Sequence, residues 1–500
     1  MKALLMHRDR ELNLHQERPW NEQALVQDLE LGTLIHAMAR GDEFLSTVAR
    51  ASLLSGFDID LVTILYRQQV LKDCLKNSGV VRKLYDLTVE ATVGAKRQWW
   101  GLSSDYPSSM LYSSVDLLEF LLGMLRKLMN MAGGAAVQFY SVAFTALFAT
   151  LQKELGNEYL ASIEKHLKEL KFRKGVLVNA QLGEGNEGIH YVLSQSHGKD
   201  PNWLERILGN RPQEHTFYLA ERDEAGARIL SNMRDQAISR VAPALAQSSD
   251  HVLSFFTMLR TELAFYVGCL NLHDLLADKE EPVCFPVPAP SGVHAVRFRG
   301  LYDVSLSLRL ERRVVGNTVD VGGKRLTIVT GANQGGKSSF LRSVGLAQVM
   351  MQCGMFVAAE AFESGLCPSL FTHYKREEDA TMIRGKLDEE LSRMSGIIDH
   401  LASNSILLFN ESFAATNERE GSEIAKQVVC ALLEKRIRIF YVTHLYEFAR
   451  GFFDQKRSDT LFLRAERNSD GTRPFRLVEG EPLQTAYGED LFHQIFEPHK

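Results

Sequence analysis

The chain has 500 residues, 45% of them hydrophobic and 24% charged, with a net charge of −5 at pH 7. This length predicts two or three domains, and the composition is that of a soluble globular protein. The weakly acidic charge gives no overall argument for nucleic-acid binding, although it leaves a local basic face open. Six scattered cysteines without a Cys-x-x-Cys pair argue against a zinc site or a disulfide framework and predict a cytoplasmic protein.

The first part of the chain predicts a mainly helical domain. The early charges at Arg8 and Arg10, with no apolar run, are not those of a signal peptide. Apolar residues recur at helical spacing from Leu34 to Val48, and the pattern continues to about residue 93.

Two apolar helices are expected next. Ser114 is placed to cap a helix over Val115–Met129, and Gly133-Gly134 is expected to break the chain before a second helix over Ala135–Leu155. Both are too short or too interrupted for good membrane spans, so we expect buried core helices and no membrane partner.

A β-hairpin is predicted further on. Val176–Val178 and Ile189–Leu193 are strand-like and flank the segment Gly183–Gly188. The glycines also match G-x-G-x-x-G, but a dinucleotide site requires a helix after them, and here a strand pattern follows. The pattern therefore favours a turn.

A helical pattern at about 251–276 is followed by four prolines within 282–290. Proline at this density prevents both helix and strand pairing, so we expect a domain boundary there. Strands alternate with helices from Val293 onward, including a hairpin turning at Gly322-Gly323, which predicts an α/β domain with its site at the carboxyl ends of the strands. The expected parts are a helical domain at 1–280, a proline-rich linker with a first strand at 281–297 and an α/β domain at 298–500.

The strand Leu326–Thr330 leads into G-x-x-x-x-G-K-S, and a helix pattern continues to about Gln352. This order predicts a P-loop, in which glycines allow backbone N–H groups to face phosphate oxygens. Lys337 would reach the β- and γ-phosphates of ATP, and the Ser338 hydroxyl would bind Mg²⁺. The predicted nucleotide-binding residues are Gly331, Ala332, Asn333, Gln334, Gly335, Gly336, Lys337, Ser338 and Ser339.

The apolar strand Ile406–Phe409 ends in Asn410-Glu411, the Walker B position of P-loop ATPases. There a carboxylate helps to hold Mg²⁺ and the following glutamate polarises the attacking water. Asn410 accepts through its amide oxygen but has no charge, which predicts weaker Mg²⁺ binding. Glu411 keeps the place of the catalytic base. The alternative is a buried strand that simply ends in a loop.

A second apolar strand, beginning at Arg438, ends in Thr443-His444. After a Walker pair, such a histidine is a candidate γ-phosphate sensor. The alternative is a core histidine with satisfied hydrogen bonds.

Taken in this order, the three elements resemble the ATPase domain of the MutS family, the mismatch-repair branch of the ABC-type ATPases. Residues 330–339 stand where MutS proteins have TGPNMGGKST. Similarity to the family extends over 298–497 and includes Gln352–Glu360, Asn410-Glu411 with Thr416 and Gly421, Thr443-His444, and Leu477–Gly480 through Tyr487-Gly488. The fold class implied is an α/β P-loop NTPase of the ABC/MutS type after a mainly helical domain with a hairpin.

The resemblance implies a homodimer in which each site is completed in trans by the partner's signature segment. That segment would fall at Arg384–Leu391, so Gly385, Lys386 and Glu390 are expected to face the partner's nucleotide. The family's serine is missing, because Gly385 or Lys386 stands in its place. Lys386 either supplies charge to a γ-phosphate or is a solvated lysine. With Asn410, this departure puts fast hydrolysis in doubt.

By the same resemblance, the helical part corresponds to the MutS core and lever regions, and the cargo is DNA in repair or recombination. The mismatch-reading domain with its Phe-x-Glu wedge is expected to be absent, so mismatches should not be discriminated. Two stretches either bind DNA or form a solvated face and a packed aromatic pair. They are Lys165, Lys168, Lys171, Arg173 and Lys174, and Lys96, Arg97, Trp99 and Trp100.

We therefore expect a cytoplasmic, homodimeric, MutS-like ATPase that uses ATP and Mg²⁺, with ATP-driven dimer closure and slow hydrolysis. One alternative is a nucleotide-gated protein-interaction module with little or no ATPase activity. Another is an ATPase that acts on a different nucleic-acid structure, such as branched DNA.

Overall fold

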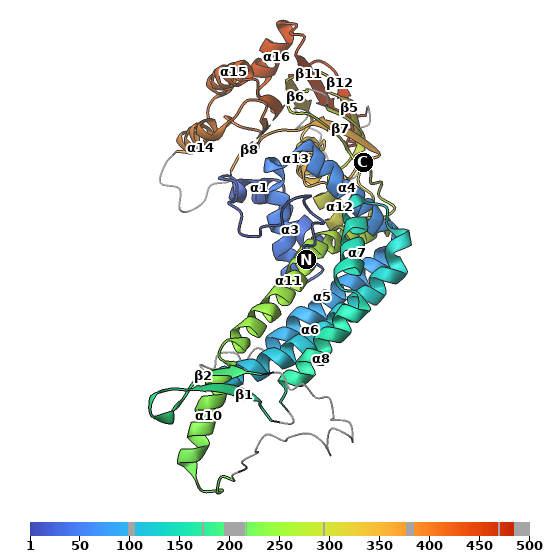
Figure 1. The fold of residues 1–500 in the computed structure, drawn as a ribbon. Helices are drawn as coiled ribbons and strands as arrows, with labels where there is room; N and C mark the ends of the chain where they lie inside the picture. Colours follow the sequence, from blue (N-terminus) through green and yellow to red (C-terminus); the bar gives the residue numbers. More distant parts are fainter. Residues whose placement is uncertain are drawn as a thin grey trace, which may run out of the picture. The chain divides into compact units, whose positions relative to one another are not determined.

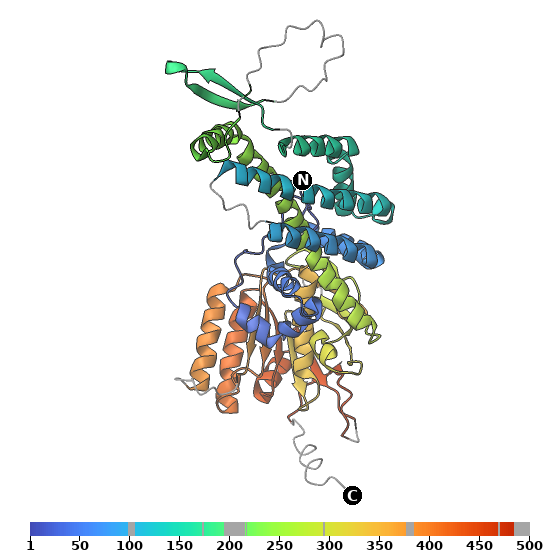
Figure 2. The same ribbon diagram turned by 90° about the horizontal axis from the view of Figure 1, so that it is seen from below.

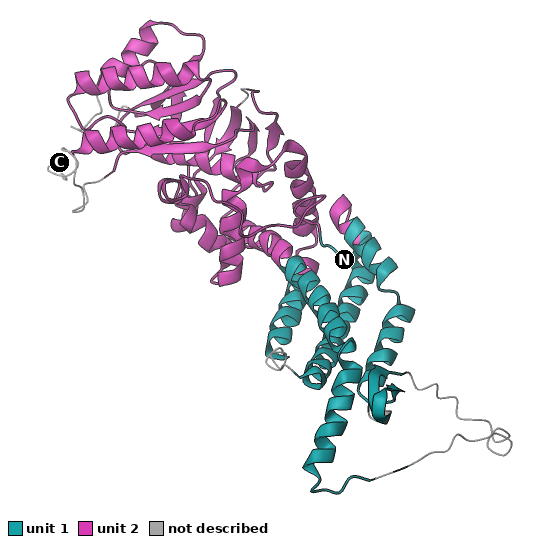
Figure 3. Ribbon diagram, turned by 60° about the vertical axis from the view of Figure 1, so that its left-hand side comes forward, with its two compact units in different colours: residues 1–3, 82–137, 145–260 teal, residues 4–81, 138–144, 261–500 magenta. Residues whose placement is uncertain are grey.

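The computed structural model describes most of the chain. The described residues are 1–98, 106–172, 175–194, 216, 218–293, 296–376, 385–468 and 471–484. They divide into two compact units, shown in separate colours in Figure 3. Unit 1 takes residues 1–3, 82–137 and 145–260, and unit 2 takes residues 4–81, 138–144 and 261–500. Each unit combines distant parts of the sequence, and the expected functional division at 281–297 stays a prediction.

The amino-terminal part is mainly helical, as predicted, and carries one small hairpin (Figure 1). Its longer helices are α5 (Ser78–Gln98), α6 (Pro107–Ala135), α7 (Val142–Glu154), α8 (Asn157–Leu170), α10 (Glu224–Ile238) and α11 (Val241–Ala277). The strands β1 (Val178–Leu182) and β2 (Gly188–Leu193) pair antiparallel. Gly185 has a φ of 73° in the connection between them. The glycine-rich segment is therefore a hairpin turn, as predicted.

The boundaries predicted around α6 are wrong. The helix begins at Pro107 and continues through Gly133 and Gly134 to Ala135, and Ser114 is buried inside it. Proline suits the first turn because its missing N–H would have no partner there. The two glycines cost about 1 kcal/mol each, which the buried leucine face of this long helix offsets. The next helix accordingly begins at Val142.

Two helices among the described residues are long and apolar enough to cross a membrane by length and composition alone. They are Pro107–Gln138 and Val241–Ala277, and 50% and 67% of their most apolar windows are buried inside the protein. Core helices of soluble proteins pass the same test. The expectation that no membrane partner exists therefore stays a prediction.

Unit 2 begins with short helices and continues into two sheets. The helices are α1 (Glu22–Asp28), α2 (Leu31–Ala39), α3 (Glu43–Leu54), the 3₁₀ turn η1 (Gly56–Asp58) and α4 (Leu61–Lys76). In the described residues the larger sheet has the order β12-β11-β6-β10-β9-β8, and the smaller has the order β3-β7-β4-β5.

The larger sheet is parallel except for β12, and its central strands are buried along their length. Its strands are β6 (Leu326–Gly331), β8 (Leu370–Tyr374), β9 (Ile406–Asn410), β10 (Arg438–Val442), β11 (Thr460–Ala465) and β12 (Leu477–Glu479). Near-continuous apolar runs suit these strands because helices cover both faces of a parallel sheet. The predicted strands and their α/β alternation are confirmed.

Helices cover the two faces of this sheet (Figure 2). Apolar residues of α14 (Lys386–His400), α15 (Glu418–Glu434) and α16 (Tyr446–Asp454) share a core with Leu407, Phe409 and Tyr441 of the strands. Helix α13 (Lys337–Gln352) packs on β9 and β10 as well, where Gly345 lies against Leu408. Because Leu407 and Leu408 are adjacent in a strand, they point to opposite faces.

The predicted hairpin at Gly322-Gly323 is wrong. The smaller sheet contains β3 (Val287–Ala289), β4 (Val296–Leu301), β5 (Asn317–Asp320) and β7 (Ala361–Gly365). Strand β5 pairs antiparallel with β4, and the chain then turns at Gly322-Gly323 into the other sheet. There β6 pairs with β10 on one side and β11 on the other, which leaves no edge for β5.

Candidate functional site

The loop between β6 and α13 curls tightly at the carboxyl end of its strand. Gly331, Gln334 and Gly336 have φ angles of 110°, 56° and 86°. A Cβ at Gly331 would lie 2.8 Å from the backbone nitrogen of Ala465, and one at Gly335 would lie 2.9 Å from the carbonyl oxygen of Ala332. The glycines therefore allow a close backbone approach as well as the turn. Helix α13 then starts with Gly336 as its N-cap, so its first N–H groups face the loop.

Lys337 places a buried cation in this loop. Its side chain is 5% exposed, and Nζ donates to the carbonyl oxygens of Gly331 and Ala332 at 2.9 Å each. Burial lowers the pKa of Lys337 to about 8, and the Glu411 carboxylate opposes this shift. A desolvated ammonium group that donates only to neutral carbonyls keeps an uncompensated charge, which an anion could balance.

The two residues predicted to hold Mg²⁺ lie together. Ser338 Oγ donates to Asn410 Oδ1 at 3.1 Å, which joins the start of α13 to the end of β9. Hydroxyl and amide oxygens suit Mg²⁺, although neither brings a negative charge. Among the residues that the structure describes, no cluster of three or more His, Cys, Asp or Glu side chains is arranged to hold a metal. Mg²⁺ at this place would therefore need phosphate and water ligands as well.

Glu411 and His444 also come together, from the ends of two neighbouring strands. His444 Nε2 lies 2.9 Å from Glu411 Oε1, so the imidazole N–H donates to the carboxylate. This hydrogen bond is the main cause that holds the pKa of Glu411 below its usual value, while burial opposes it. Glu411 is therefore ionised at neutral pH and available to accept a proton.

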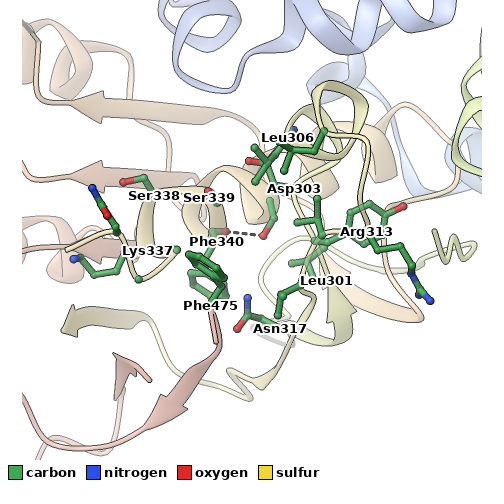
Figure 4. Close-up of a pocket in the computed structure, with 18 of the residues that line it drawn as sticks. Leu301, Asp303, Leu306, Arg313, Asn317, Lys337, Ser338, Ser339, Phe340 and Phe475 are labelled. Carbon is green, nitrogen blue, oxygen red and sulfur yellow. Dashed lines mark hydrogen bonds between the residues drawn. The ribbon is translucent and has the colours of Figure 1, made fainter. Parts of the chain in front are cut away.

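A cavity of about 430 Å³ opens beside these residues. Figure 4 shows Lys337 and Ser338 at one end and Leu301, Leu306 and Arg313 on the other side, with Phe475 between. The first end, which we call the loop end, is lined by residues 333–339 and Glu411. The other, which we call the wall end, is lined by apolar residues together with Asp303, Arg312, Arg313 and Asn317. The cavity thus offers the glycine-rich loop at one end and a mixed apolar and charged wall at the other, a lining that suits a ligand with both polar and apolar parts.

The wall end depends on two charged residues that follow α11. Glu281, whose side chain is 1% exposed, accepts from the backbone N–H of Val314 at 2.8 Å and from Ser307 Oγ at 3.1 Å. Lys279 Nζ donates to the carbonyl oxygens of Ser307 at 2.5 Å and Leu310 at 2.7 Å. Together they fix the segment that follows α12 (Val304–Arg309). No sequence motif pointed to them, because the contacts join residues far apart in the chain.

Phe475 is another lining residue that the sequence did not reveal. It has a φ of 59°, and the residue is 42% exposed. Its backbone and Cβ lie close over Gly336, where an added Cβ would be 3.4 Å away. Arg473 nearby donates to Gln334 Oε1 at 3.4 Å. The segment after β11 therefore covers the glycine-rich loop and presents an aromatic ring to the cavity.

The predicted signature segment is split by the structure. Gly385 is the exposed N-cap of α14, and Lys386 is the first residue of that helix. Glu390, in contrast, is 3% exposed, and its Oε2 accepts from the backbone N–H of Phe413 in the same chain at 2.8 Å. Gly385 and Lys386 keep their expected role in trans as a prediction. The Glu390 carboxylate is bound to the backbone of its own chain.

The basic stretches are only partly described. Lys171 Nζ lies 2.6 Å from Glu119 and 3.3 Å from Asp116, so acidic neighbours offset its charge. Lys165 and Lys168 lie on α8. Arg173, Lys174, Trp99 and Trp100 lie outside the described residues. A DNA-binding face in this region stays a prediction.

A mainly parallel sheet with a glycine-rich loop, a buried lysine and polar strand ends around one cavity defines an α/β protein with a cavity at the carboxyl ends of its strands, where proteins of this class bind their ligands. Residues 59–279 match the family described as MutS2 N-terminal domain, and residues 327–500 match the family described as MutS domain V. The chain belongs to the MutS family, which confirms the resemblance seen in the sequence.

Individual relatives agree with this assignment. The DNA mismatch repair protein MutS of Thermotoga neapolitana is 29% identical over 174 residues, which is 34% of this chain and 22% of that protein. The MutS of Flavobacterium psychrophilum is 23% identical over 314 residues, 59% of this chain and 34% of the relative. MutS protein homolog 4 of Mus musculus is 27% identical over 168 residues, 34% and 17% of the two chains. The chain thus matches from about a sixth to a third of the length of these relatives.

Proposed function

We propose that this chain is a P-loop ATPase of the MutS type that binds ATP across the cavity, with the phosphates at the loop end. The observation that carries this proposal is Lys337, a buried cation whose Nζ contacts only loop carbonyls and lines the cavity beside Ser338 and Glu411. The backbone N–H groups of 333–336 and the start of α13 add donors and a positive dipole for the phosphates.

Glu411 is the proposed catalytic base. Its carboxylate is ionised, so one oxygen is free to accept a proton from the water that attacks the γ-phosphate. His444 Nε2 donates to Oε1, the other oxygen of the Glu411 carboxylate, at 2.9 Å and holds the carboxylate in place. His444 is also the proposed γ-phosphate sensor, because it follows β10, the strand that pairs with β9.

Mg²⁺ fits the pair formed by Ser338 and Asn410, whose side-chain oxygens lie 3.1 Å apart. Bound there, it would supply positive charge to the terminal phosphates. Asn410 contributes no charge of its own, so the proposal includes weak Mg²⁺ binding and slow turnover.

We further propose that two copies of the chain close on ATP, with Gly385 and Lys386 of one copy facing the nucleotide of the other. The exposed start of α14 supports this arrangement. The relatives named DNA mismatch repair proteins support DNA in repair as the cargo. Recombination and a cytoplasmic location remain part of the proposal. The second candidate is a nucleotide-gated interaction module with little hydrolysis, which the uncharged Asn410 favours.

The test compares the wild-type protein with Glu411→Gln, a variant that keeps the shape of the site and removes the base. We expect ATP affinity within about twofold of wild type and phosphate release at least about 100-fold slower. Light scattering on the variant should show dimers with ATP and fewer without it. If the folded wild type does not bind ATP, the proposal is wrong, and monomers at saturating ATP would remove dimer closure from it.

DNA binding needs its own measurement. Affinity for paired, mismatched and branched duplexes should be compared with and without ATP in a salt series, because phosphate contacts give a steep salt dependence. Salt-independent or absent binding would favour the interaction module.

A further inference from the structure

The loop that carries Glu411 has an unusual backbone. Glu411 and Phe413 have φ angles of 55° and 61°, although neither is a glycine, and they flank Ser412. Left-handed conformations of such residues cost free energy and persist only where surrounding contacts enforce them. The contacts around this loop therefore decide how the Glu411 carboxylate is aimed.

Two side chains from the sheet hold the middle of the loop. Tyr441 OH donates to the carbonyl oxygen of Ser412 at 3.0 Å. His373 Nδ1 lies 2.7 Å from Ser412 Oγ, and its Nε2 lies 3.0 Å from the carbonyl oxygen of Glu390. Burial lowers the pKa of His373 to about 4, so the ring is neutral and its one N–H, at Nε2, donates to the Glu390 carbonyl, which can only accept. Ser412 Oγ lies against Nδ1 and donates to the backbone carbonyl oxygen of His373 at 2.5 Å. All four of these residues are buried.

Glu390 completes this network from helix α14. Its carboxylate accepts from the backbone N–H of Phe413 at 2.8 Å, and its own carbonyl accepts from His373. The Phe413 ring is fully buried and stacks on His373 with centroids 5.3 Å apart. Glu390 is thus tied to the loop through both its side chain and its backbone.

Helix α14 begins at Lys386, four residues before Glu390. One helical turn therefore separates the exposed start of the helix from the residue that holds the Glu411 loop. The polar groups between the helix start and the loop are buried and cannot exchange their partners for water. A movement of the helix start would therefore displace the loop as well.

We propose that Glu390 is a positioning residue of its own chain: it holds residues 411–413 and links the start of α14 to the orientation of Glu411. This role rests on the proposed function of Glu411 as a base. It replaces the role expected from the sequence, in which Glu390 faces the nucleotide of a second copy. The start of α14 then acts on hydrolysis through Glu390.

The test uses Glu390→Ala, Glu390→Gln and the control Glu389→Ala. Glu389 is the adjacent acidic residue of α14 and pairs with Arg393. Hydrogen exchange of the Phe413 amide should be at least about tenfold faster in Glu390→Ala, because its acceptor is lost. Maximal ATP hydrolysis should fall at least about tenfold with KM within about twofold, as for a group that acts on the chemical step. Glu390→Gln keeps an oxygen acceptor and should restore both, and Glu389→Ala should behave as wild type.

Unchanged exchange at Phe413 in Glu390→Ala would overturn the proposal, and so would equal effects of Glu389→Ala. A parallel loss of ATP affinity and hydrolysis would also overturn it, because a general structural role predicts that result. If the alanine variant does not fold, Glu390→Asp, whose carboxylate is one methylene shorter, is measured in its place. If wild type binds ATP without hydrolysing it, the proposed base function fails, while the exchange measurement still decides the role of Glu390.

Discussion

The two ends of the cavity are built in different ways. The loop end consists of the consecutive residues 333–339, whose Lys337 provides a buried charge, together with Glu411 at the end of β9. The wall end is assembled from separate segments, with Glu281 and Lys279 holding the residues that follow α12 and Phe475 lying between the two ends. The difference teaches that one end depends on a single buried cation, whereas the other depends on several contacts between separate segments. Substitutions should therefore lower ATP affinity strongly at the loop end and moderately at the wall end.

The largest effect is expected for Lys337→Ala. The variant removes the cation that would contact the terminal phosphates, so ATP affinity should fall by about 100-fold, or about 2.7 kcal/mol. The folded state should not lose stability, because burial of this ammonium is unfavourable. Calorimetric titration measures the affinity, and Lys435→Ala, at an exposed lysine, is the control. A folded variant with wild-type affinity would show that the loop end does not bind phosphate.

A smaller effect is expected at the wall end. Glu281→Ala leaves the Val314 N–H and the Ser307 hydroxyl without their buried acceptor. Unfolding free energy should fall by about 1–3 kcal/mol, and ATP affinity by about tenfold as the wall loosens. Denaturant titration and nucleotide titration check these values, with Glu280→Ala as the exposed neighbour control. If the stability falls and the affinity does not, the wall end does not contact the nucleotide.

The affinity should also depend on pH through the loop end. The pKa of Lys337 is lowered to about 8, so this lysine loses its proton as pH rises through that value. Bound phosphate favours the charged form, so ATP affinity at pH 9 should be about a tenth of that below pH 7. The folded state itself should gain stability from pH 8 toward 10.5, because the unfolded lysine holds its proton longer. Titrations of wild type and Lys337→Ala across this range give the comparison, and an equal slope in both would remove Lys337 as the cause.

The smallest effect is expected at the junction of Ser338 and Asn410. Asn410→Asp restores a carboxylate next to the proposed Mg²⁺ position, so turnover should rise by about threefold or the Mg²⁺ requirement should fall. Steady-state hydrolysis at several Mg²⁺ concentrations measures both. Brisk wild-type turnover at low Mg²⁺, with no gain in the variant, would contradict the explanation for slow hydrolysis.

The two ends also differ in how far the sequence predicted them. The strand Leu326–Thr330, the glycine spacing and the helix to Gln352 are local features, and the structure confirms them. Apolar runs predicted the strands before Asn410 and His444. These strands pair in parallel, so their carboxyl ends, with Glu411 and His444, lie side by side. Such features are predictable because neighbouring residues alone determine them.

The wall end and Glu390 were beyond such reasoning. Glu281 contacts Val314 33 positions away, and Glu390 contacts Phe413 23 positions away, so no local pattern reports either bond. The resemblance to the MutS family implied that Glu390 faces the nucleotide of a second copy, whereas tertiary packing buries it in its own chain. The Gly133-Gly134 pair predicted a break that the structure does not have, because packing of α6 overrides the weak helix preference of glycine.

The central claim is that one nucleotide spans both ends of the cavity, and separate ligands for each end test it most directly. Pyrophosphate and adenosine should be titrated into wild type, Lys337→Ala and Glu281→Ala. The account predicts that Lys337→Ala loses pyrophosphate binding and keeps adenosine binding, and that Glu281→Ala weakens adenosine and keeps pyrophosphate. If each variant weakens both ligands to the same extent, or neither, the two ends do not form the phosphate and base halves of one site.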